Sequence, residues 1–232
     1  MSKKIGIIGD FKENLLNHTA INKAIEINKQ EQYPELDYEW LPTQNLHQID
    51  LSTYDGFWLA PGGPYVSDDN VLDAIKWIRE SKQVPFLGNC SGFQYGIFEF
   101  MKNVVGLIDV NTEEVDANAA NKVVSKLSCS LRGNIHQSVF IKKKTKVYEI
   151  IQQAQITETY NCNYGVSPEY QEMLDEHGLV VAGVNEDGEA RILELPHHPF
   201  FILSLFQPAM NTSKEHPHPL ITAFIKALFT IS

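Results

Sequence analysis

The sequence predicts an α/β fold built on a parallel sheet that is flanked by helices. Short apolar segments, which suit buried strands, alternate along the first half of the chain with segments whose apolar residues recur at helical spacing. Three of the apolar segments run directly into turns that contain glycine. This alternation is typical of strand–helix–strand units in a parallel sheet, and we expect the 232 residues to form a single domain over residues 1–232.

The first half of the chain supplies the parallel strands. We expect strands over residues 5–9, 38–41, 54–60 and 84–87, and helices over residues 71–81 and 93–105. A further helix follows Asn17, whose side chain can cap its first turn. Ile21, Ala24 and Ile25 share one face of that helix.

The second half of the chain shows a different pattern. Alternating residues or short apolar runs predict strands over residues 135–141, 147–151, 179–183, 190–195 and 200–206. Residues 185–188 suit a hairpin-like turn between two of these strands, and residues 219–229 suit a final helix.

Charge and cysteine content exclude several classes of protein. Lys and Arg number 19 and Asp and Glu number 29, and the net charge of −10 argues against nucleic acid or an anionic membrane as a partner. The three cysteines form no CxxC pair, and no phosphate-binding glycine motif follows the first strand, so we expect neither a metal site nor a cofactor. No segment matches a signal peptide or a membrane span, so we expect a cytoplasmic protein.

Residues 88–92, Gly-Asn-Cys-Ser-Gly, carry the strongest chemical signal. They join a predicted strand to a predicted helix, and small residues permit the sharp turn that presents a nucleophile at the top of a sheet. Cys90 would lie at a helix N-terminus, where N–H groups favour the thiolate; the alternative is a buried thiol in a tight turn. Residues 61–64, Pro-Gly-Gly-Pro, end a neighbouring strand, and their N–H groups can approach a developing oxyanion.

Six segments, taken in order, resemble those of class I glutamine amidotransferases, most of all the glutaminase domain of CTP synthase: residues 4–9, 54–63, 85–94, 102–109, 166–170 and 194–201. The resemblance implies an open, mostly parallel, flavodoxin-like sheet with helices on both faces. In this family the elbow cysteine attacks the side-chain amide of glutamine, a glutamyl thioester forms, and ammonia leaves for a synthetase site.

The resemblance also assigns roles to individual residues. It implies that Cys90 is the nucleophile and that the N–H groups of Gly63 and Ser91 form the oxyanion hole. It implies a small amide substrate and a separate synthetase partner. The substrate-binding residues that it implies are Gly62, Gln94 and Glu114.

Two motifs of the family are changed in this chain. The His-Pro-Glu motif after the last core strand is replaced by Gln207-Pro208-Ala209, and a carboxamide cannot accept a proton at neutral pH. The Arg-His-Arg-Tyr segment, which holds the carboxylate of glutamine, is replaced by residues 161–164, Asn-Cys-Asn-Tyr, which lack the cation. We expect Cys162 in this segment to be a passive thiol.

Two histidines are candidates for a substitute base. His216 and His218 follow the same loop as Gln207, with roles at a helix start or on the surface as the alternative. The sequence therefore favours a thiol amidohydrolase of this type with an altered substrate or weak glutaminase activity. The alternative is a catalytically inactive binding or regulatory protein that has kept the fold.

Overall fold

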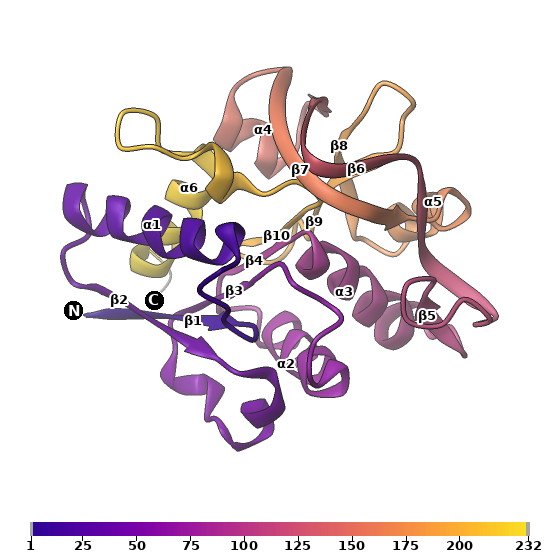
Figure 1. Cartoon of the computed structure of the whole chain (residues 1–232), viewed down its shortest axis with the longest axis horizontal. Coiled ribbons are helices and arrows are strands. Elements are labelled where there is room, and N and C mark those ends of the chain that lie inside the picture. The colour runs from indigo at the N-terminus through magenta and orange to yellow at the C-terminus, as the bar shows by residue number, and fades with distance from the viewer. Residues whose placement is uncertain (1, 231–232) are drawn as a thin grey trace.

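A ten-stranded sheet organises the computed structural model of the chain, which describes residues 2–230 (Figure 1). Five strands at one side are parallel, in the order β2-β1-β3-β4-β10. Their bounds are β1 (Lys3–Ile8), β2 (Leu36–Leu41), β3 (Gly56–Leu59), β4 (Phe86–Asn89) and β10 (Phe201–Ser204). The fold is therefore an open, mostly parallel α/β sheet, as the sequence predicts.

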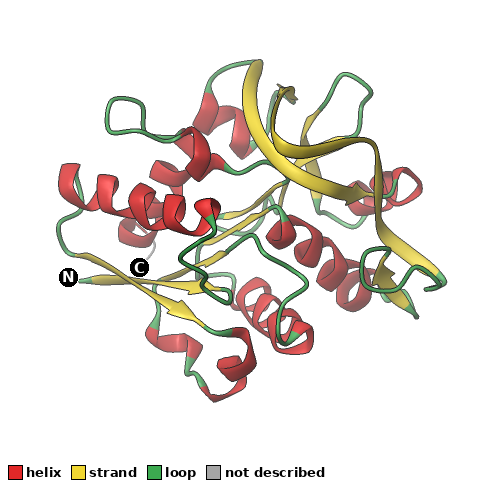
Figure 2. Cartoon of the chain, in the orientation of Figure 1, coloured by secondary structure: helices red, strands yellow, loops and turns green. Residues whose placement is uncertain are grey.

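The other side of the sheet is antiparallel apart from one short strand. Next to β10 come β9 (Ala190–Glu194), β8 (Val180–Val184) and β6 (Asn121–Ile141). The long strand β6 also pairs with β7 (Gln155–Val166) and, in parallel, with β5 (Val110–Thr112). The two long strands β6 and β7 curve together away from the parallel strands (Figures 1 and 2).

Helices cover both faces of the parallel strands, as two neighbouring side chains of β3 show. Phe57 packs its ring on Trp77 of α2, and Trp58 packs its ring on Phe224 of α6. Since successive side chains of a strand point to opposite faces, α2 and α6 lie on opposite sides of the sheet. The α-helices are α1 (Leu16–Glu31), α2 (Asp68–Ser81), α3 (Ser91–Phe100), α4 (Lys146–Ile151), α5 (Pro168–Glu176) and α6 (Pro219–Thr230).

Short helical turns complete the connections. Those of 3-10 type are η1 (Thr43–Gln48), η2 (Leu51–Thr53) and η4 (Pro208–Asn211), and α3 continues into a π-helical turn, η3 (Met101–Val105). No helix within residues 2–230 is long and apolar enough to cross a membrane.

Two local predictions were wrong. Residues 147–151 belong to helix α4 and not to a strand. The helix begins there because Thr145 caps it and the carboxylate of Glu194 accepts the N–H groups of Lys146 and Val147. Asn17 lies inside α1 rather than at its cap, since that helix begins at Leu16 without a side-chain cap.

The turn between β4 and α3 depends on close packing of backbone. A Cβ atom on Gly92 would lie 2.6 Å from the carbonyl oxygen of Leu59 in β3, and one on Gly88 would lie 2.9 Å from the carbonyl oxygen of Gly92. Between these glycines Cys90 takes φ 53° and ψ −105°, a conformation that L-residues rarely adopt. The strained turn therefore places the Cys90 side chain at the carboxyl edge of the sheet.

The side chain of Asn89 ties this turn to both neighbouring strands. Its Oδ1 accepts the indole N–H of Trp58 in β3 at 2.6 Å, and its Nδ2 donates to the hydroxyl of Ser204 in β10 at 2.6 Å. The backbone N–H of Cys90 also donates to the carbonyl oxygen of Ser204 at 2.9 Å. All these groups are buried, so the three strands fix the position of the elbow from either side.

We expect Gly92→Ala to destabilise the protein by about 1–3 kcal/mol, because the added methyl group meets fixed backbone rather than a movable side chain. Gly96→Ala is the matched control on the same helix, since its Cβ would meet the movable methyl groups of Leu203. Urea unfolding followed by circular dichroism measures both free energies of unfolding. Equal stability of the Gly92→Ala and wild-type chains would contradict the packing described here.

Candidate active site

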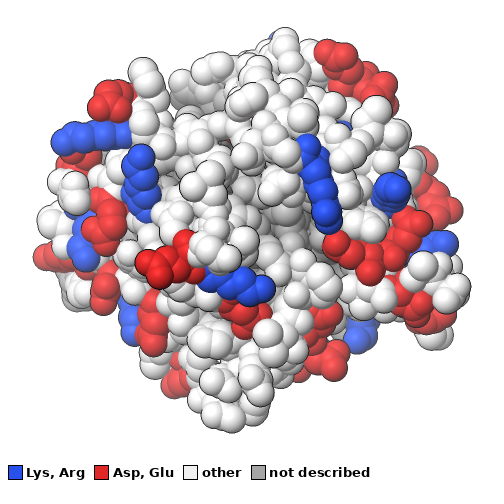
Figure 3. Space-filling view, viewed as in Figure 1, with Lys and Arg blue, Asp and Glu red and all other residues white. Residues whose placement is uncertain are grey.

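A cavity of about 360 Å³ lies at the carboxyl edge of the parallel strands and contains Cys90. We call it the Cys90 cavity. Figure 3 shows that the middle of this face is hollowed and mostly uncharged, with charged side chains around it. The cavity is lined by Leu15, Asn17, Pro61, Gly62, Gly63, Cys90, Ser91, Gln94, Glu114, Arg132, Asn161, Cys162, Asn163, Tyr164 and Gln207.

Most of the site residues named from the sequence meet in this cavity. The fold brings together the elbow, the β3–α2 loop, the segment after β5 and the loop after β10. The residues brought together are Gly62, Gly63, Cys90, Ser91, Gln94, Glu114 and Gln207. Ala209 does not line the cavity; it is buried in η4 and faces Leu16 and Ala20 of α1.

Hydrogen-bond donors surround the sulfur of Cys90. The neighbouring thiol of Cys162 lowers the pKa of Cys90, against the opposing effect of burial. The side-chain amide of Gln207 and the N–H and hydroxyl of Ser91 lower this pKa further. When protonated, Cys90 donates to the carbonyl oxygen of Asn161 at 3.9 Å. The site therefore favours a thiolate through donors, and no His or carboxylate within residues 2–230 hydrogen-bonds to this sulfur.

Gln207 occupies the place expected of a general base. Its backbone N–H donates to the carbonyl oxygen of Thr159 at 3.0 Å, and its side chain is buried beside Cys90. Its Nε2 has no partner at ordinary hydrogen-bond geometry within the described part of the chain. This amide can donate to a thiolate, but it cannot take a proton from water.

A side chain of the elbow, that of Ser91, hydrogen-bonds to the loop of residues 61–64. The N–H groups of Gly62 and Gly63 donate to the hydroxyl oxygen of Ser91 at 3.2 and 2.8 Å. For these N–H groups to bind a developing oxyanion, the serine side chain must turn away. Ser91 is thus both a neighbour of the thiolate and an occupant of the predicted oxyanion hole.

His18, which sequence reasoning missed, fixes the same loop from the other side. Its Nε2 lies 2.7 Å from the carbonyl oxygen of Pro61, and its Nδ1 accepts the N–H of Lys12 at 3.1 Å. Because Nδ1 accepts, the proton sits on Nε2. Burial lowers the pKa of His18, which keeps the ring neutral. No sequence motif identifies this role, since it depends on where α1 meets the loop.

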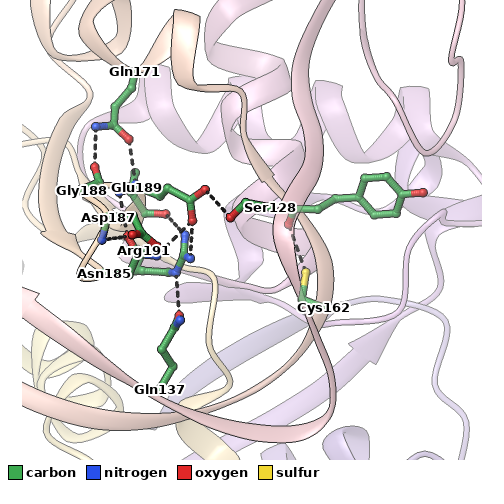
Figure 4. Close-up of polar contacts among 11 residues, drawn as sticks. Ser128, Gln137, Cys162, Gln171, Asn185, Asp187, Gly188, Glu189 and Arg191 are labelled. Carbon is green, nitrogen blue, oxygen red and sulfur yellow. Dashed lines mark hydrogen bonds and ion pairs between the residues drawn. The ribbon is translucent and has the colours of Figure 1, made fainter.

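Hydrogen bonds hold the sulfur of Cys162 in place, and the expectation that it is a passive thiol stays a prediction. The sulfur accepts the Nε2 of Gln94 at 3.2 Å. It donates to the carbonyl oxygen of Tyr164 at 3.2 Å (Figure 4). The neighbouring Cys90, together with burial, holds the pKa of Cys162 well above its usual range. Gln94 thereby binds α3 to β7.

Glu114 and Arg132 are the charged residues of the cavity. Burial raises the pKa of Glu114, and the positive charge of Arg132 opposes that effect. Arg132 lies where β6 bends, next to Gly133 (φ 94°) and Asn134 (φ 57°). Sequence reasoning missed this arginine, although Gly133 and Asn134 are residue types that favour the positive φ of such a bend.

Two asparagines of β7, Asn161 and Asn163, hold this bend. Asn161 Oδ1 accepts the N–H of Gly133 at 3.2 Å, and Asn163 Oδ1 accepts the hydroxyl of Ser130 at 2.6 Å. Arg132 lies between these two anchored positions. The segment 161–164, which has no cation of its own, therefore supports a strand that brings one to the cavity.

The structure does not bring His216 or His218 to Cys90. Both line a separate cavity of about 370 Å³, together with His136 and Asn211. The Nε2 of His218 lies 2.9 Å from Oε1 of the buried Glu158, whose other oxygen accepts the Asn211 amide at 2.7 Å. The hypothesis of a substitute base from this loop therefore has no support in the geometry.

A second polar cluster lies beyond β7 and does not line the Cys90 cavity (Figure 4). Arg191 is 2% exposed and pairs with Glu189 at 2.7 Å, while Gln137 accepts its Nε at 3.3 Å. Asn185 organises the turn before Glu189. This network satisfies a buried cation and stabilises the β8–β9 hairpin. Among residues 2–230, no group of three or more His, Cys, Asp or Glu side chains is arranged to hold a metal ion.

Comparisons with known proteins agree with this arrangement. A CTP synthase from Saccharolobus solfataricus is 32% identical over 197 residues, which cover 82% of this chain and 36% of that protein. A CTP synthase from Sulfurisphaera tokodaii is 30% identical over 237 residues, which cover 97% of this chain and 44% of that protein. The chain thus spans less than half the length of these curated relatives.

Solved structures show the same fold. The glutaminase domain of Trypanosoma brucei CTPS with bound acivicin has a TM-score of 0.88 at 20% identity, covering 100% of this chain and 95% of that one. A glutamine amidotransferase from Thermotoga maritima has a TM-score of 0.60 at 11% identity, covering 99% and 97%. Residues 17–227 match the family described as Glutamine amidotransferase class-I. Since this match extends over most of the sheet and includes the elbow, the chain belongs to the class I glutamine amidotransferase family.

Proposed function

We propose that this chain is a cysteine-dependent amidohydrolase whose second half-reaction is impaired. The observation that carries the proposal is the set of donors around Cys90, which favours a thiolate without a neighbouring base. A thiolate can attack an amide carbonyl directly; the C–N bond then breaks, the amine leaves with a proton taken from solvent, and a thioester remains. Hydrolysis of that thioester requires activated water, and Gln207 offers no base for this step. The acylated form of Cys90 therefore accumulates.

The charges of the cavity indicate the kind of amide. Arg132 suits a carboxylate, and Glu114 suits an ammonium group. An amide of an amino acid that carries both a free carboxylate and a free ammonium group could therefore bind to both residues. Glutamine has this chemistry, as do other side-chain or terminal amides of amino acids. The carboxylate would bind to β6 rather than to the changed segment of β7.

The relatives indicate what could use the ammonia. The CTP synthases described above extend well beyond the part that this chain matches. We propose that any ammonia released at Cys90 passes to a synthetase partner. A soluble, reducing compartment such as the cytoplasm suits the free thiols Cys90, Cys129 and Cys162.

A second candidate function is a binding or regulatory domain without turnover. This function is favoured by the hydroxyl of Ser91. It accepts the N–H groups of Gly62 and Gly63, which would otherwise be free to bind an oxyanion. In that case the cavity binds an amino-acid-like ligand but stabilises no tetrahedral intermediate. Acylation of Cys90 distinguishes the two functions, because only the first forms a thioester.

We expect slow ammonia release from glutamine or a related amide, and its loss in Cys90→Ala. The double variant Gln207→His with Ala209→Glu restores a base and its orienting acid, and we expect it to raise the rate by about 10²-fold or more. Coupled ammonia detection measures the rate, and intact-mass spectrometry measures acylated Cys90. Absence of both ammonia and acylation for every amide tested would favour the second function.

We expect Arg132→Ala to slow labelling of Cys90 by acivicin about tenfold or more, because a charge-assisted hydrogen bond to the ligand carboxylate is lost. Lys122→Ala, on the same strand but outside the cavity, is the control. Labelling by neutral iodoacetamide should be equal in all three chains. An equal loss with both reagents would mean that Arg132 only maintains the shape of the cavity.

We expect Cys90 to react with iodoacetamide down to a pH below the usual thiol pKa of about 8.5. Alkylation requires the thiolate, so the rate falls as the pH falls through the lowered pKa of Cys90. Cys162→Ala removes the main donor and should move the midpoint to higher pH, whereas Cys162→Ser keeps an O–H donor and should move it less. Peptide mapping of Cys90 across pH gives each midpoint; a native midpoint at or above that of the unfolded chain would contradict the donor arrangement.

A further inference from the structure

We propose that Cys90 and Cys162 form a peroxide-sensitive pair, in which a peroxide oxidises Cys90 and Cys162 then captures it as an intrachain disulfide. The disulfide does not depend on the amide chemistry proposed above. Its consequence, reversible loss of turnover, rests on that proposed function.

The two thiols meet inside the Cys90 cavity. Cys90 Sγ lies 3.9 Å from the carbonyl oxygen of Asn161, the residue that precedes Cys162. Both side chains line this cavity, and they are only 7% and 5% exposed. Sulfur atoms in a disulfide lie about 2.05 Å apart, so the two side chains must rotate toward each other for the bond to close.

Other contacts hold the second sulfur in place. Gln94, one turn after Cys90 on α3, donates its Nε2 to Cys162 Sγ at 3.2 Å and to the carbonyl oxygen of Tyr164 at 3.0 Å. The N–H of Gln94 bonds in turn to the carbonyl oxygen of Cys90 at 3.2 Å. One glutamine therefore ties β7 to the elbow and keeps the sulfurs on the same side of the cavity.

The first step is oxidation of the thiolate. The sulfur of Cys90 attacks one peroxide oxygen, the O–O bond breaks, and the departing hydroxide takes a proton from solvent to become water. Cys90 is thereby oxidised to a sulfenic acid while the peroxide is reduced. The donors that favour its thiolate make Cys90 the cysteine that reacts first, since thiolate character governs this reaction.

The second step forms the disulfide. Cys162 loses its proton and attacks the sulfur of Cys90, the S–O bond breaks, and hydroxide leaves with that proton as water. In the reduced protein, the neighbouring Cys90 and burial both raise the pKa of Cys162. Oxidation of Cys90 removes the negative charge of its thiolate, so Cys162 then ionises more easily.

The third cysteine provides a matched control. Cys129 is exposed on β6 and does not line the Cys90 cavity. If oxidation followed exposure alone, Cys129 would react first. If it follows thiolate character and contact, the product links Cys90 to Cys162 and leaves Cys129 reduced.

The test treats the reduced full chain with hydrogen peroxide, blocks free thiols with N-ethylmaleimide, and maps peptides without reductant. We expect a Cys90–Cys162 disulfide within one chain, reversed by dithiothreitol and formed equally in Cys129→Ser. In Cys162→Ser we expect a Cys90 sulfenic acid that dimedone traps and a several-fold larger share of sulfinic acid. Cys162→Ala repeats this comparison should the serine variant fold poorly, as checked by circular dichroism.

Two results would overturn the proposal. One is a disulfide that involves Cys129 instead of Cys162. The other is equal sulfinic acid at Cys90 in the wild-type chain and in the Cys162 variants. Because these readouts are peptide masses, they are independent of amide turnover, and failure of the proposed amidohydrolase function would leave them unchanged.

Discussion

The contact between the first turn of α3 and the backbone of β3 is the constraint on which the site depends. Gly92 permits this contact, and Asn89 locks the turn to the strands on either side. The strained backbone at Cys90 persists because these neighbours determine it from several directions. Moving the elbow would displace the thiol, the Ser91 hydroxyl and the loop at Gly63 together. The geometry of the Cys90 site is therefore a consequence of packing in the core.

The site stabilises a charge instead of moving a proton. In a cysteine hydrolase with a paired histidine, one side chain activates the nucleophile and later activates water. Here the donors Cys162, Gln207 and Ser91 favour the thiolate, and none of them accepts a proton from water. Lowering the pKa of a thiol also lowers its intrinsic nucleophilicity. In the reaction that we propose, the arrangement affects the two half-reactions differently: attack by a thiolate needs no base, whereas deacylation does.

The sequence predicted the parallel strands, the elbow and most of the cavity, because these follow from local apolar runs and glycine turns. It missed what depends on distant contacts. Residues 147–151 form a helix because Glu194, far along the chain, accepts its first N–H groups. Arg132 reaches the cavity through a bend at Gly133 and Asn134; these residues favour a turn, but the side chain that the turn directs into the cavity depends on the pairing of β6 with β7. His218 is held elsewhere by Glu158, a pairing between residues that sequence spacing does not connect.

The changes in this chain are also linked to one another. Asn161 and Asn163 stand in the segment that resembles the carboxylate-binding segment of the family, and both bind the bend of β6 that carries Arg132. The residue between them, Cys162, lines the same cavity as Cys90. The two asparagines therefore hold a strand that supplies a cation to the cavity, although their own segment has none. By contrast, Nε2 of Gln207 has no hydrogen-bond partner within residues 2–230, and Ala209 contributes no polar side chain. The cavity thus has a charge that suits a carboxylate but no base beside Cys90, and the proposed impairment of deacylation rests on that difference.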